Sequence, residues 1–269
     1  MLWDCHMHSS FSGDSDTPME QMIQAGIQNG LTGICFTEHL DLDFPDTPDH
    51  FDFTIDFPTY HALFLELKEK YRNQISLHYG MELGLQPHLA NTFDQILHDH
   101  SFDFVIGSVH LLNGCDPYYP ETFAGKDESE CYRRYFESIL MNLQVFSGFD
   151  SLGHLDYIVR YGPNRNKDYS YSKYRDIIDA ILEQLIRRDI ALELNTAGYN
   201  AGLGSPNPCR EVLQRYKELG GKMITIGSDA HIPERVASRF EDASELLKSL
   251  GFTAYTVFHN HIPEFHRIK

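Results

Sequence analysis

The stretch Leu2-Trp3-Asp4-Cys5-His6-Met7-His8 joins a short, largely apolar run to two histidines that stand two residues apart. Residues two apart on an extended strand point to the same side, so the two imidazoles are expected to face together. Other strand-like runs also lead directly to a histidine or a carboxylate: GICFTE (33–38), SLHYGM (76–81), FDFVIGSV (102–109), DSLG (150–153) and KMITIGS (222–228). Polar side chains at the ends of successive parallel strands predict a β/α barrel with a site at one mouth.

Strand-like and helix-like segments alternate along the chain, which is the pattern of a parallel β/α architecture. Strands are predicted at 2–7, 33–37, 76–82, 103–108, 150–154, 190–195 and 222–228, with an eighth candidate at 253–258. Helices are predicted at 58–72, 88–99, 127–146, 172–188, 207–219 and 235–250, after a first helix that Thr17 is expected to cap. Such a barrel needs about 250 residues, so residues 1–269 are expected to form one domain.

Composition narrows the possible partners and the compartment. Hydrophobic residues make up 42% of the 269 residues, and no apolar run is long enough to suggest a membrane span. The formal net charge of −17 argues against nucleic acid or an anionic membrane as the main partner. An anionic small substrate stays possible, because bound metal ions would dominate the local field. The start shows no secretion signal, and five cysteines without a C-x-x-C motif favour a cytoplasmic protein.

Nine candidate metal ligands, six histidines and three carboxylates, lie at or near the predicted strand ends. They are His6, His8, Asp14, His39, Glu82, His110, His154, Asp229 and His231. Imidazoles and carboxylates suit zinc, iron or manganese, and a glutamate can bridge two ions. One histidine alone is more often structural, but convergence from five or six strand ends predicts a multi-metal hydrolytic centre. Glu38, beside His39, is expected to support the site without binding metal.

Two further H-x-H pairs compete with the first one. His98 and His100 are expected to lie at the end of a helix. His259 and His261 follow a candidate strand and are interpreted as surface or capping groups. The acidic segment 40–58 is expected to form a long loop beside the barrel mouth, where it would shape access to the site.

Six motifs in order, H-x-H, T-[DE]-H, G-x-E, G-S-x-H, G-H-x-D and S-D-A-H, resemble those of the PHP (polymerase and histidinol phosphatase) family. They stand here at 6–8, 37–39, 80–82, 107–110, 153–156 and 228–231. FSGDS (11–15) and LELNTAG (192–198) look like the monofunctional histidinol-phosphatase branch. The resemblance implies a distorted (β/α)7 TIM-like barrel that holds three divalent ions.

The resemblance also distributes the candidate ligands among three ions. The first ion would be held by His6, His8, Glu82 and Asp229. The second would share Glu82 and add His110 and His154. The third would use Asp14, His39 and His231. A histidine often stands at the position of Asp14 in the family, and the alternative interpretation of Asp14 is a turn residue of SGDSD.

A phosphate clamp is expected at Arg160, because a guanidinium can contact two phosphate oxygens at once. Family members often carry an arginine near Tyr199, which this chain lacks. Arg165 and Lys167 are weaker candidates.

The implied reaction is hydrolysis of L-histidinol phosphate to L-histidinol and phosphate, a step of histidine biosynthesis. A hydroxide bridging two ions would attack phosphorus, with Arg160, Asp229 and His231 acting in catalysis. A histidine or a metal-coordinated water would supply the leaving-group proton. Asp41, Asp43 and Asp46 in the acidic loop would attract the cationic part of this substrate.

Three other functions remain open from the sequence. The chain could act on another phosphoester, such as a nucleotide, a sugar phosphate or phosphotyrosine. It could be a barrel amidohydrolase, although those enzymes usually bridge their ions with a lysine where this chain has Glu82. It could also be a non-catalytic, metal-binding regulatory domain, although every expected ligand is present.

Overall fold

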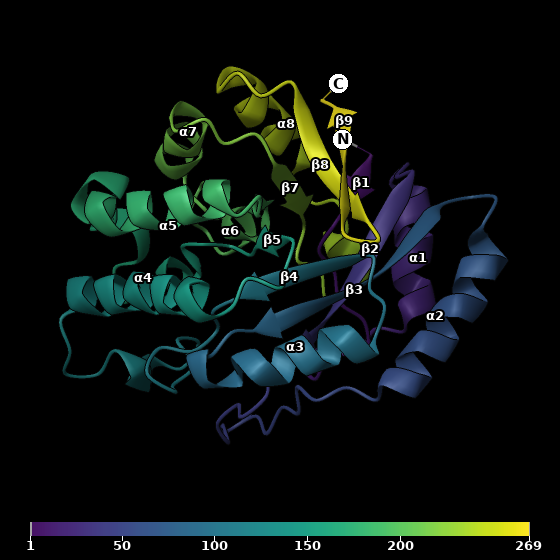
Figure 1. The fold of residues 1–269 in the computed structure, drawn as a ribbon, viewed down its shortest axis with the longest axis horizontal. Coiled ribbons are helices and arrows are strands. Elements are labelled where there is room, and N and C mark those ends of the chain that lie inside the picture. The colour runs from purple at the N-terminus through teal and green to yellow at the C-terminus, as the bar shows by residue number, and fades with distance from the viewer. Residues whose placement is uncertain (1, 269) are drawn as a thin grey trace.

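The computed structural model describes residues 2–268, and its centre is a seven-stranded parallel sheet that curls into a barrel (Figure 1). The amide of Cys5 donates to the carbonyl of Ile226 over 2.9 Å, and the amide of Asp229 donates to the carbonyl of His6 over 2.8 Å. These two hydrogen bonds join the first strand to the last and close the barrel. The predicted distorted barrel of seven units is therefore confirmed. The strands pair in chain order: β1 (Trp3–Asp4), β2 (Gly33–Leu40), β3 (Ser76–Gly84), β4 (Phe104–Ser108), β5 (Ser151–Leu152), β6 (Ala191–Asn195) and β7 (Ile224–Gly227).

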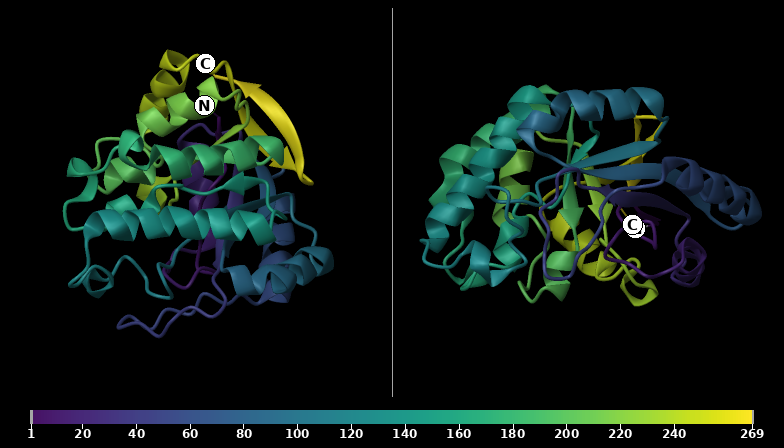
Figure 2. Two further views of the ribbon diagram at one scale, coloured as in Figure 1. Left: turned by 60° about the vertical axis from the view of Figure 1, so that its left-hand side comes forward. Right: turned by 90° about the horizontal axis from the view of Figure 1, so that it is seen from below.

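Helices surround the strands, as the view from below shows (Figure 2, right). They form because apolar residues recur every three or four positions, as in α5, where Ile178, Ile181, Leu182 and Leu185 are all buried. The α-helices are α1 (Met19–Gln28), α2 (Phe57–Tyr71), α3 (Ala90–Asp99), α4 (Glu128–Val145), α5 (Arg175–Arg187), α6 (Ala197–Asn200), α7 (Arg210–Glu218) and α8 (Phe240–Ser249).

The expected cap of the first helix is wrong. Helix α1 begins at Met19, and no side chain caps its first turn. The Thr17 hydroxyl instead donates to the backbone carbonyl of His231 over 2.9 Å, and the Ser15 hydroxyl donates to the same carbonyl over 2.8 Å. The segment before α1 is therefore tied to the last of the six motifs.

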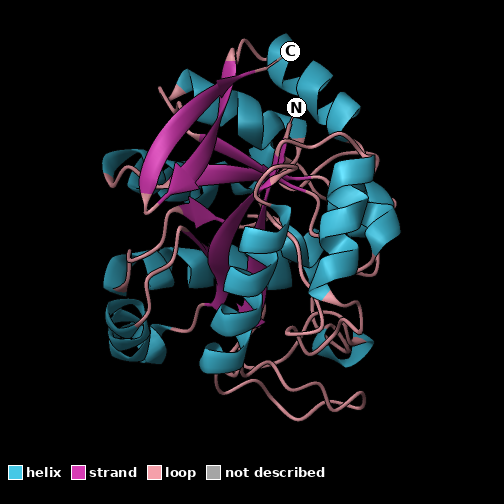
Figure 3. Cartoon of the chain, turned by 90° about the vertical axis from the view of Figure 1, so that its right-hand side faces the viewer, coloured by secondary structure: helices cyan, strands magenta, loops and turns pink. Residues whose placement is uncertain are grey.

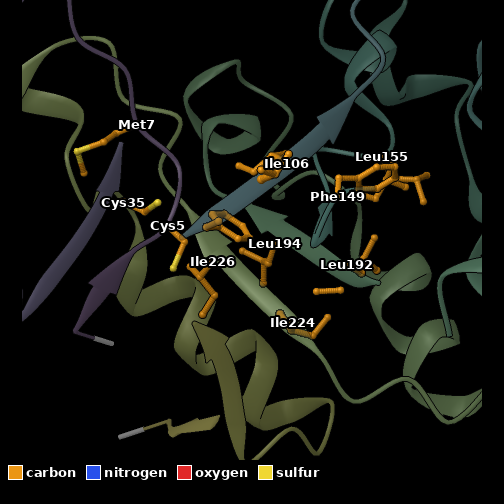
Figure 4. Close-up of a cluster of buried hydrophobic side chains, with 14 of the residues drawn as sticks. Cys5, Met7, Cys35, Ile106, Phe149, Leu155, Leu192, Leu194, Ile224 and Ile226 are labelled. Carbon is orange, nitrogen blue, oxygen red and sulfur yellow. The ribbon is translucent and has the colours of Figure 1, made fainter. Parts of the chain in front are cut away.

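An apolar core lies among the strands and beneath the helices (Figure 4). On β6, Leu192 and Leu194 belong to this core, while Glu193 and Asn195 alternate with them and are equally buried. Because successive side chains of a strand point to opposite faces, β6 directs its apolar and its polar pair to different sides. Polar side chains buried in this way need partners, and they find them in the site described below.

The eighth predicted strand lies outside the barrel. It forms β8 (Ala254–His259), which pairs antiparallel with β9 (Ile262–Arg267), a strand that the sequence patterns did not indicate (Figure 3). His259 Nδ1 lies 3.3 Å from a carboxylate oxygen of Asp103, and His261 Nδ1 lies 2.9 Å from one of Asp150. Asp103 and Asp150 stand directly before β4 and β5, so this third H-x-H pair tethers the hairpin to the amino ends of the strands, away from the carboxyl ends.

The acidic segment after β2 forms a long loop, with no regular element between β2 and α2 (Figure 2, left). His98 lies in the last turn of α3, as expected, and the ring of His100 stacks on Phe57 with centroids 4.1 Å apart. Among residues 2–268, no helix is both long enough and apolar enough to cross a membrane.

Candidate metal centre

All nine predicted ligands come together at the carboxyl ends of the strands, and the buried carboxylate of Glu82 lies at the centre. Its Oε2 is 3.2 Å from His6 Nε2 and 3.1 Å from His39 Nδ1. Its Oε1 is 3.0 Å from His154 Nε2 and 3.2 Å from His110 Nε2. One carboxylate thus contacts four imidazoles that stand at or just after the ends of four different strands.

The remaining four candidates complete the cluster. His8 Nε2 is 3.4 Å from Asp229 Oδ1. Asp14 Oδ2 lies 3.1 Å from His231 Nε2 and 3.8 Å from His39 Nε2. Asp14, for which a ligand and a turn residue were both considered, therefore lies beside two candidate ligands of the third site.

Hydrogen bonds behind the cluster set which ring nitrogen of two histidines is free. His6 Nδ1 lies 2.6 Å from Glu193 Oε1, and His110 Nδ1 lies 2.7 Å from Asp41 Oδ1. A carboxylate can only accept, so each Nδ1 carries the proton and each Nε2 lone pair faces the cluster. This arrangement is the one in which a histidine binds a metal ion through Nε2.

His8 is oriented through a serine. The Ser12 hydroxyl donates to Glu38 Oε2 over 2.7 Å and therefore accepts from the Nδ1 of His8 over 3.0 Å. The same hydroxyl accepts from the backbone amide of His39 over 3.0 Å. Glu38 is fully buried and also accepts from Ser9, so it lies behind the candidate ligands, as expected for a supporting group.

The cluster fits divalent metal ions. Within residues 2–268, the buried atoms Glu82 Oε2 and His231 Nε2 have no hydrogen-bond partner, which would cost about 1–3 kcal/mol each without a compensating ligand. The ligand atoms of His6, His8 and Glu82 lie within 4.8 Å of one another, as do those of three other triplets, His8/His39/His231, Glu82/His110/His154 and His39/Asp41/His110. Imidazole nitrogens and carboxylate oxygens at this spacing are the donor set of a transition-metal site.

Strand β6 contributes two residues that the sequence analysis missed. Glu193 Oε2 accepts from the backbone amide of His154 over 2.7 Å and from Asn195 Nδ2 over 3.1 Å. Asn195 Nδ2 also lies 3.3 Å from Asp229 Oδ2. The available signal was the alternation of Glu193 and Asn195 with Leu192 and Leu194, since a buried strand with polar residues every second position points them at a common partner.

Arg160 lies at the edge of the cluster and is held by three side chains. Its Nε donates to Asn207 Oδ1 over 2.8 Å, its Nη2 donates to Asn195 Oδ1 over 2.9 Å and its Nη1 donates to Asp229 Oδ2 over 3.1 Å. Burial lowers the pKa of Arg160, but the adjacent Asp229 carboxylate raises it above its ordinary value, so the guanidinium stays charged. Of five N–H groups on a guanidinium, two remain for a ligand.

A cavity of about 280 Å³ opens above the cluster, and Arg160, Asp229 and His231 line it. Arg165 and Lys167 are not among the residues that line the cavity. Arg165 is exposed and donates to the carbonyl of Ala201, and Lys167 is exposed. Of the three cations considered as a phosphate clamp, the structure places Arg160 at the cavity.

The loop after β2 presents aromatic rings to the cavity, which differs from the acidic patch expected there. Phe44, Phe51 and Phe53 line the cavity, whereas Asp43 and Asp46 do not. Their side chains are 67% and 84% exposed, respectively, so both carboxylates are turned toward solvent. The third expected carboxylate, Asp41, does line the cavity, but it is buried and bonded to His110.

The electrostatics of the cluster depend on mutual compensation. Burial alone would raise the pKa of Glu82, but the His6 and His110 imidazoles beside it hold that pKa well below its usual range. For His231 the signs are reversed: burial lowers the pKa of the imidazole, but the neighbouring Asp14 carboxylate raises it to about 9. The carboxylates are therefore ionised and available to cations at neutral pH.

A barrel of seven parallel strands with this polar centre at its mouth defines the class of protein. The family model for the PHP domain matches residues 4–197, and the chain belongs to the PHP domain family. The family proposed from the six motifs is confirmed.

Individual relatives narrow the comparison. The chain is 34% identical to the histidinol-phosphatase of Lactococcus lactis over 256 residues, and the matched region covers 95% of this chain and 93% of the relative. It is also 34% identical over 249 residues to a Clostridium acetobutylicum protein named "Probable histidinol-phosphatase", over 93% of this chain and 94% of that one. The crystal structure of the Lactococcus lactis histidinol phosphate phosphatase with zinc, L-histidinol and phosphate superposes with a TM-score of 0.90 at 33% identity, covering 98% of both chains.

Proposed function

We propose that this protein is a metal-dependent phosphomonoesterase that hydrolyses L-histidinol phosphate to L-histidinol and phosphate. The observation that carries the proposal is the junction at Asp229, which joins a metal-type cluster to a phosphate-type cation. Its Oδ1 faces the Nε2 atoms of His6 and His8 at 3.6 and 3.4 Å, while its Oδ2 accepts from Arg160. The relatives named for this activity, at one third identity over nearly the whole chain, support the same substrate.

Three divalent ions are part of the proposal. His6, His8, Glu82 and Asp229 would hold the first ion, and Glu82, His110 and His154 would hold the second. Asp14, His39 and His231 would hold the third. Bound ions of this kind stabilise charge on phosphoryl oxygens and lower the pKa of an attacking water. Their positive charge exceeds that of the three carboxylates Asp14, Glu82 and Asp229, so the centre attracts a phosphate dianion although the chain carries a net charge of −17.

Arg160 binds the phosphate from the side of the cavity. Its guanidinium is held by Asn207, Asn195 and Asp229, so little side-chain entropy is lost when phosphate binds. The two N–H groups that these partners leave free can each donate to a phosphoryl oxygen, which orients the ester and stabilises charge that develops in the transition state. Asp229 and His231 line the same cavity, and we assign them to catalysis as ligands of the reacting centre.

The cavity also suits the other half of this substrate. Aromatic rings of Phe44, Phe53 and Tyr157 line it, and so does the carboxylate of Asp116. An imidazole can stack on such rings, and an amine is attracted by the carboxylate. A barrel amidohydrolase is disfavoured, because Glu82 stands where those enzymes usually carry a bridging lysine.

The experiment is phosphate release from L-histidinol phosphate by protein loaded with manganese, iron or zinc, compared with nucleotide, sugar phosphate and phosphotyrosine esters. We expect kcat/KM at least about a hundredfold above the panel, or about 2.7 kcal/mol of discrimination. Asp229→Asn should abolish turnover, whereas Asp43→Asn, an exposed carboxylate outside the cavity, should match wild type. Better turnover of another ester would refute the assignment of L-histidinol phosphate as the substrate. An active, metal-replete Asp229→Asn variant would refute the site.

A further inference from the structure

Asp41 contacts histidines of two different proposed ion sites. It stands directly after β2, two residues beyond His39, so that the two side chains leave the strand on the same face. Asp41 Oδ1 accepts from His110 Nδ1 over 2.7 Å. Asp41 Oδ2 lies 3.4 Å from His39 Nδ1. His110 belongs to the proposed second site and His39 to the proposed third.

The position of this carboxylate is set by the surrounding backbone. The amide of Asp41 donates to the carbonyl of Phe53 over 3.1 Å, which joins the two ends of the loop. The Asp41 side chain is only 4% exposed. A Cβ added at Gly84, the last residue of β3, would lie 2.0 Å from Asp41 Oδ1. The space that the carboxylate occupies therefore exists because residue 84 has no side chain.

His39 Nδ1 faces two carboxylates, Glu82 Oε2 at 3.1 Å and Asp41 Oδ2 at 3.4 Å, and Asp41 can accept its proton when Glu82 binds metal. Asp41 Oδ2 and His39 Nδ1 are both buried, and neither has a hydrogen-bond partner within residues 2–268. An ionised carboxylate can only accept, and the Nδ1–H of an imidazole can only donate. With the proton on Nδ1, the lone pair of His39 Nε2 faces Asp14, the carboxylate of the same proposed site.

We propose that Asp41 is a positioning residue that couples occupancy of the second and third ion sites, an inference that rests on the proposed three-ion centre. The carboxylate fixes the tautomer and orientation of His110 and His39, and it makes both imidazoles more basic ligands. Loss of such a partner typically lowers metal affinity 10–100-fold. Because one side chain serves both histidines, its removal weakens two ions together. The first ion is supported separately by Glu193 behind His6.

The test is metal binding, measured by elemental analysis after equilibration at graded concentrations of free manganese or zinc. We expect Asp41→Ala to weaken two of the bound equivalents about 10–100-fold and to leave one unchanged. Asp41→Asn should be intermediate, because its amide oxygen still accepts from His110 Nδ1 but carries no charge. Gly84→Ala should resemble Asp41→Ala, although the carboxylate is still present. Asp43→Asn is the matched control, and it should bind metal like wild type.

Three results would overturn the inference: wild-type affinity for every equivalent in Asp41→Ala, loss of a single equivalent, or equal loss of all of them. Circular dichroism of each metal-free variant identifies a fold defect, and Asp41→Asn, which preserves size and shape, decides the question if the alanine variant is unfolded. Turnover of L-histidinol phosphate is measured on the same wild-type sample. Inactive wild-type protein contradicts the proposed function, whereas active wild-type protein with unaffected Asp41 variants contradicts this inference alone.

Discussion

Asn207→Ala tests whether the phosphate clamp is held in place by the fold. Asn207 is fully buried, its Oδ1 accepts from Arg160 Nε over 2.8 Å, and its Nδ2 donates to Asp156 Oδ1 over 2.5 Å. A hydrogen bond to a charged group contributes about 1.5–3 kcal/mol, so loss of both should lower the free energy of unfolding by roughly 3–6 kcal/mol. The guanidinium keeps its contacts with Asn195 and Asp229 but gains freedom at Nε.

The assay separates stability from function. Urea unfolding followed by circular dichroism gives the free energy of unfolding, and inhibition of turnover by inorganic phosphate reports on the clamp. We expect the inhibition constant for phosphate and KM to rise about tenfold, which is about 1.4 kcal/mol of lost orientation. The matched control is Asn73→Ala, an exposed asparagine after α2, which should lie within about 0.5 kcal/mol of wild type.

The reasoning would be refuted by an Asn207→Ala variant that is destabilised by less than about 1 kcal/mol. It would also be refuted by a destabilised variant whose phosphate inhibition constant is unchanged, since Arg160 would then be oriented without Asn207. A rise in the inhibition constant for the Asn73→Ala control would show that the readout does not report on the clamp.

Two further predictions concern the supporting network and the hairpin. Glu193→Gln should lower the affinity for the first ion about 10–100-fold. The amide nitrogen of glutamine is a donor, and it would have to face a second donor, either His6 Nδ1 or the backbone amide of His154. A wild-type metal content of the variant at limiting metal concentration would contradict this prediction. The hydrogen bond to Asp150 raises the pKa of His261, so the protonated His261 should stabilise the fold fully below pH about 6.5. This stabilisation should be lost as the pH rises through the folded-state pKa of His261. An NMR titration in which Asp150→Asn leaves the His261 pKa unchanged would contradict the prediction.

The candidate ligands could be predicted because their signal is local. All of them except Asp14 follow an apolar run by a few residues, and parallel strands of a barrel bring their ends to one mouth. His259 and His261 show the limit of this rule, since they also follow a strand, but β8 lies outside the barrel and runs across the other end. The existence of a strand is visible in the residues, whereas its place in a sheet depends on tertiary packing.

The supporting residues were harder to predict, for two different reasons. Glu193 and Asp41 carried a local signal that was missed: Glu193 alternates with leucines on a buried strand, and Asp41 stands two residues after His39. Asn207 carried none, because it lies 47 residues from Arg160 in the chain and comes close only in the folded barrel. Asp41 was grouped with Asp43 by loop composition, although the structure buries one and exposes the other.

The three carboxylates Asp229, Glu193 and Asp41 share one arrangement, in which each oxygen serves a different part of the site. Asp229 faces two imidazoles with one oxygen and Arg160 with the other, and Glu193 accepts from a ring nitrogen of His6 and from the amide of His154. Substitution of any of the three therefore removes two contacts at once. Effects within such a network are not additive, because a partner already freed by one change cannot be freed again. Asp229 and Glu193 both contact His6 and Asn195, so the losses of affinity for the first ion caused by Asp229→Asn and Glu193→Gln are expected to add up to more than the loss measured in the double variant.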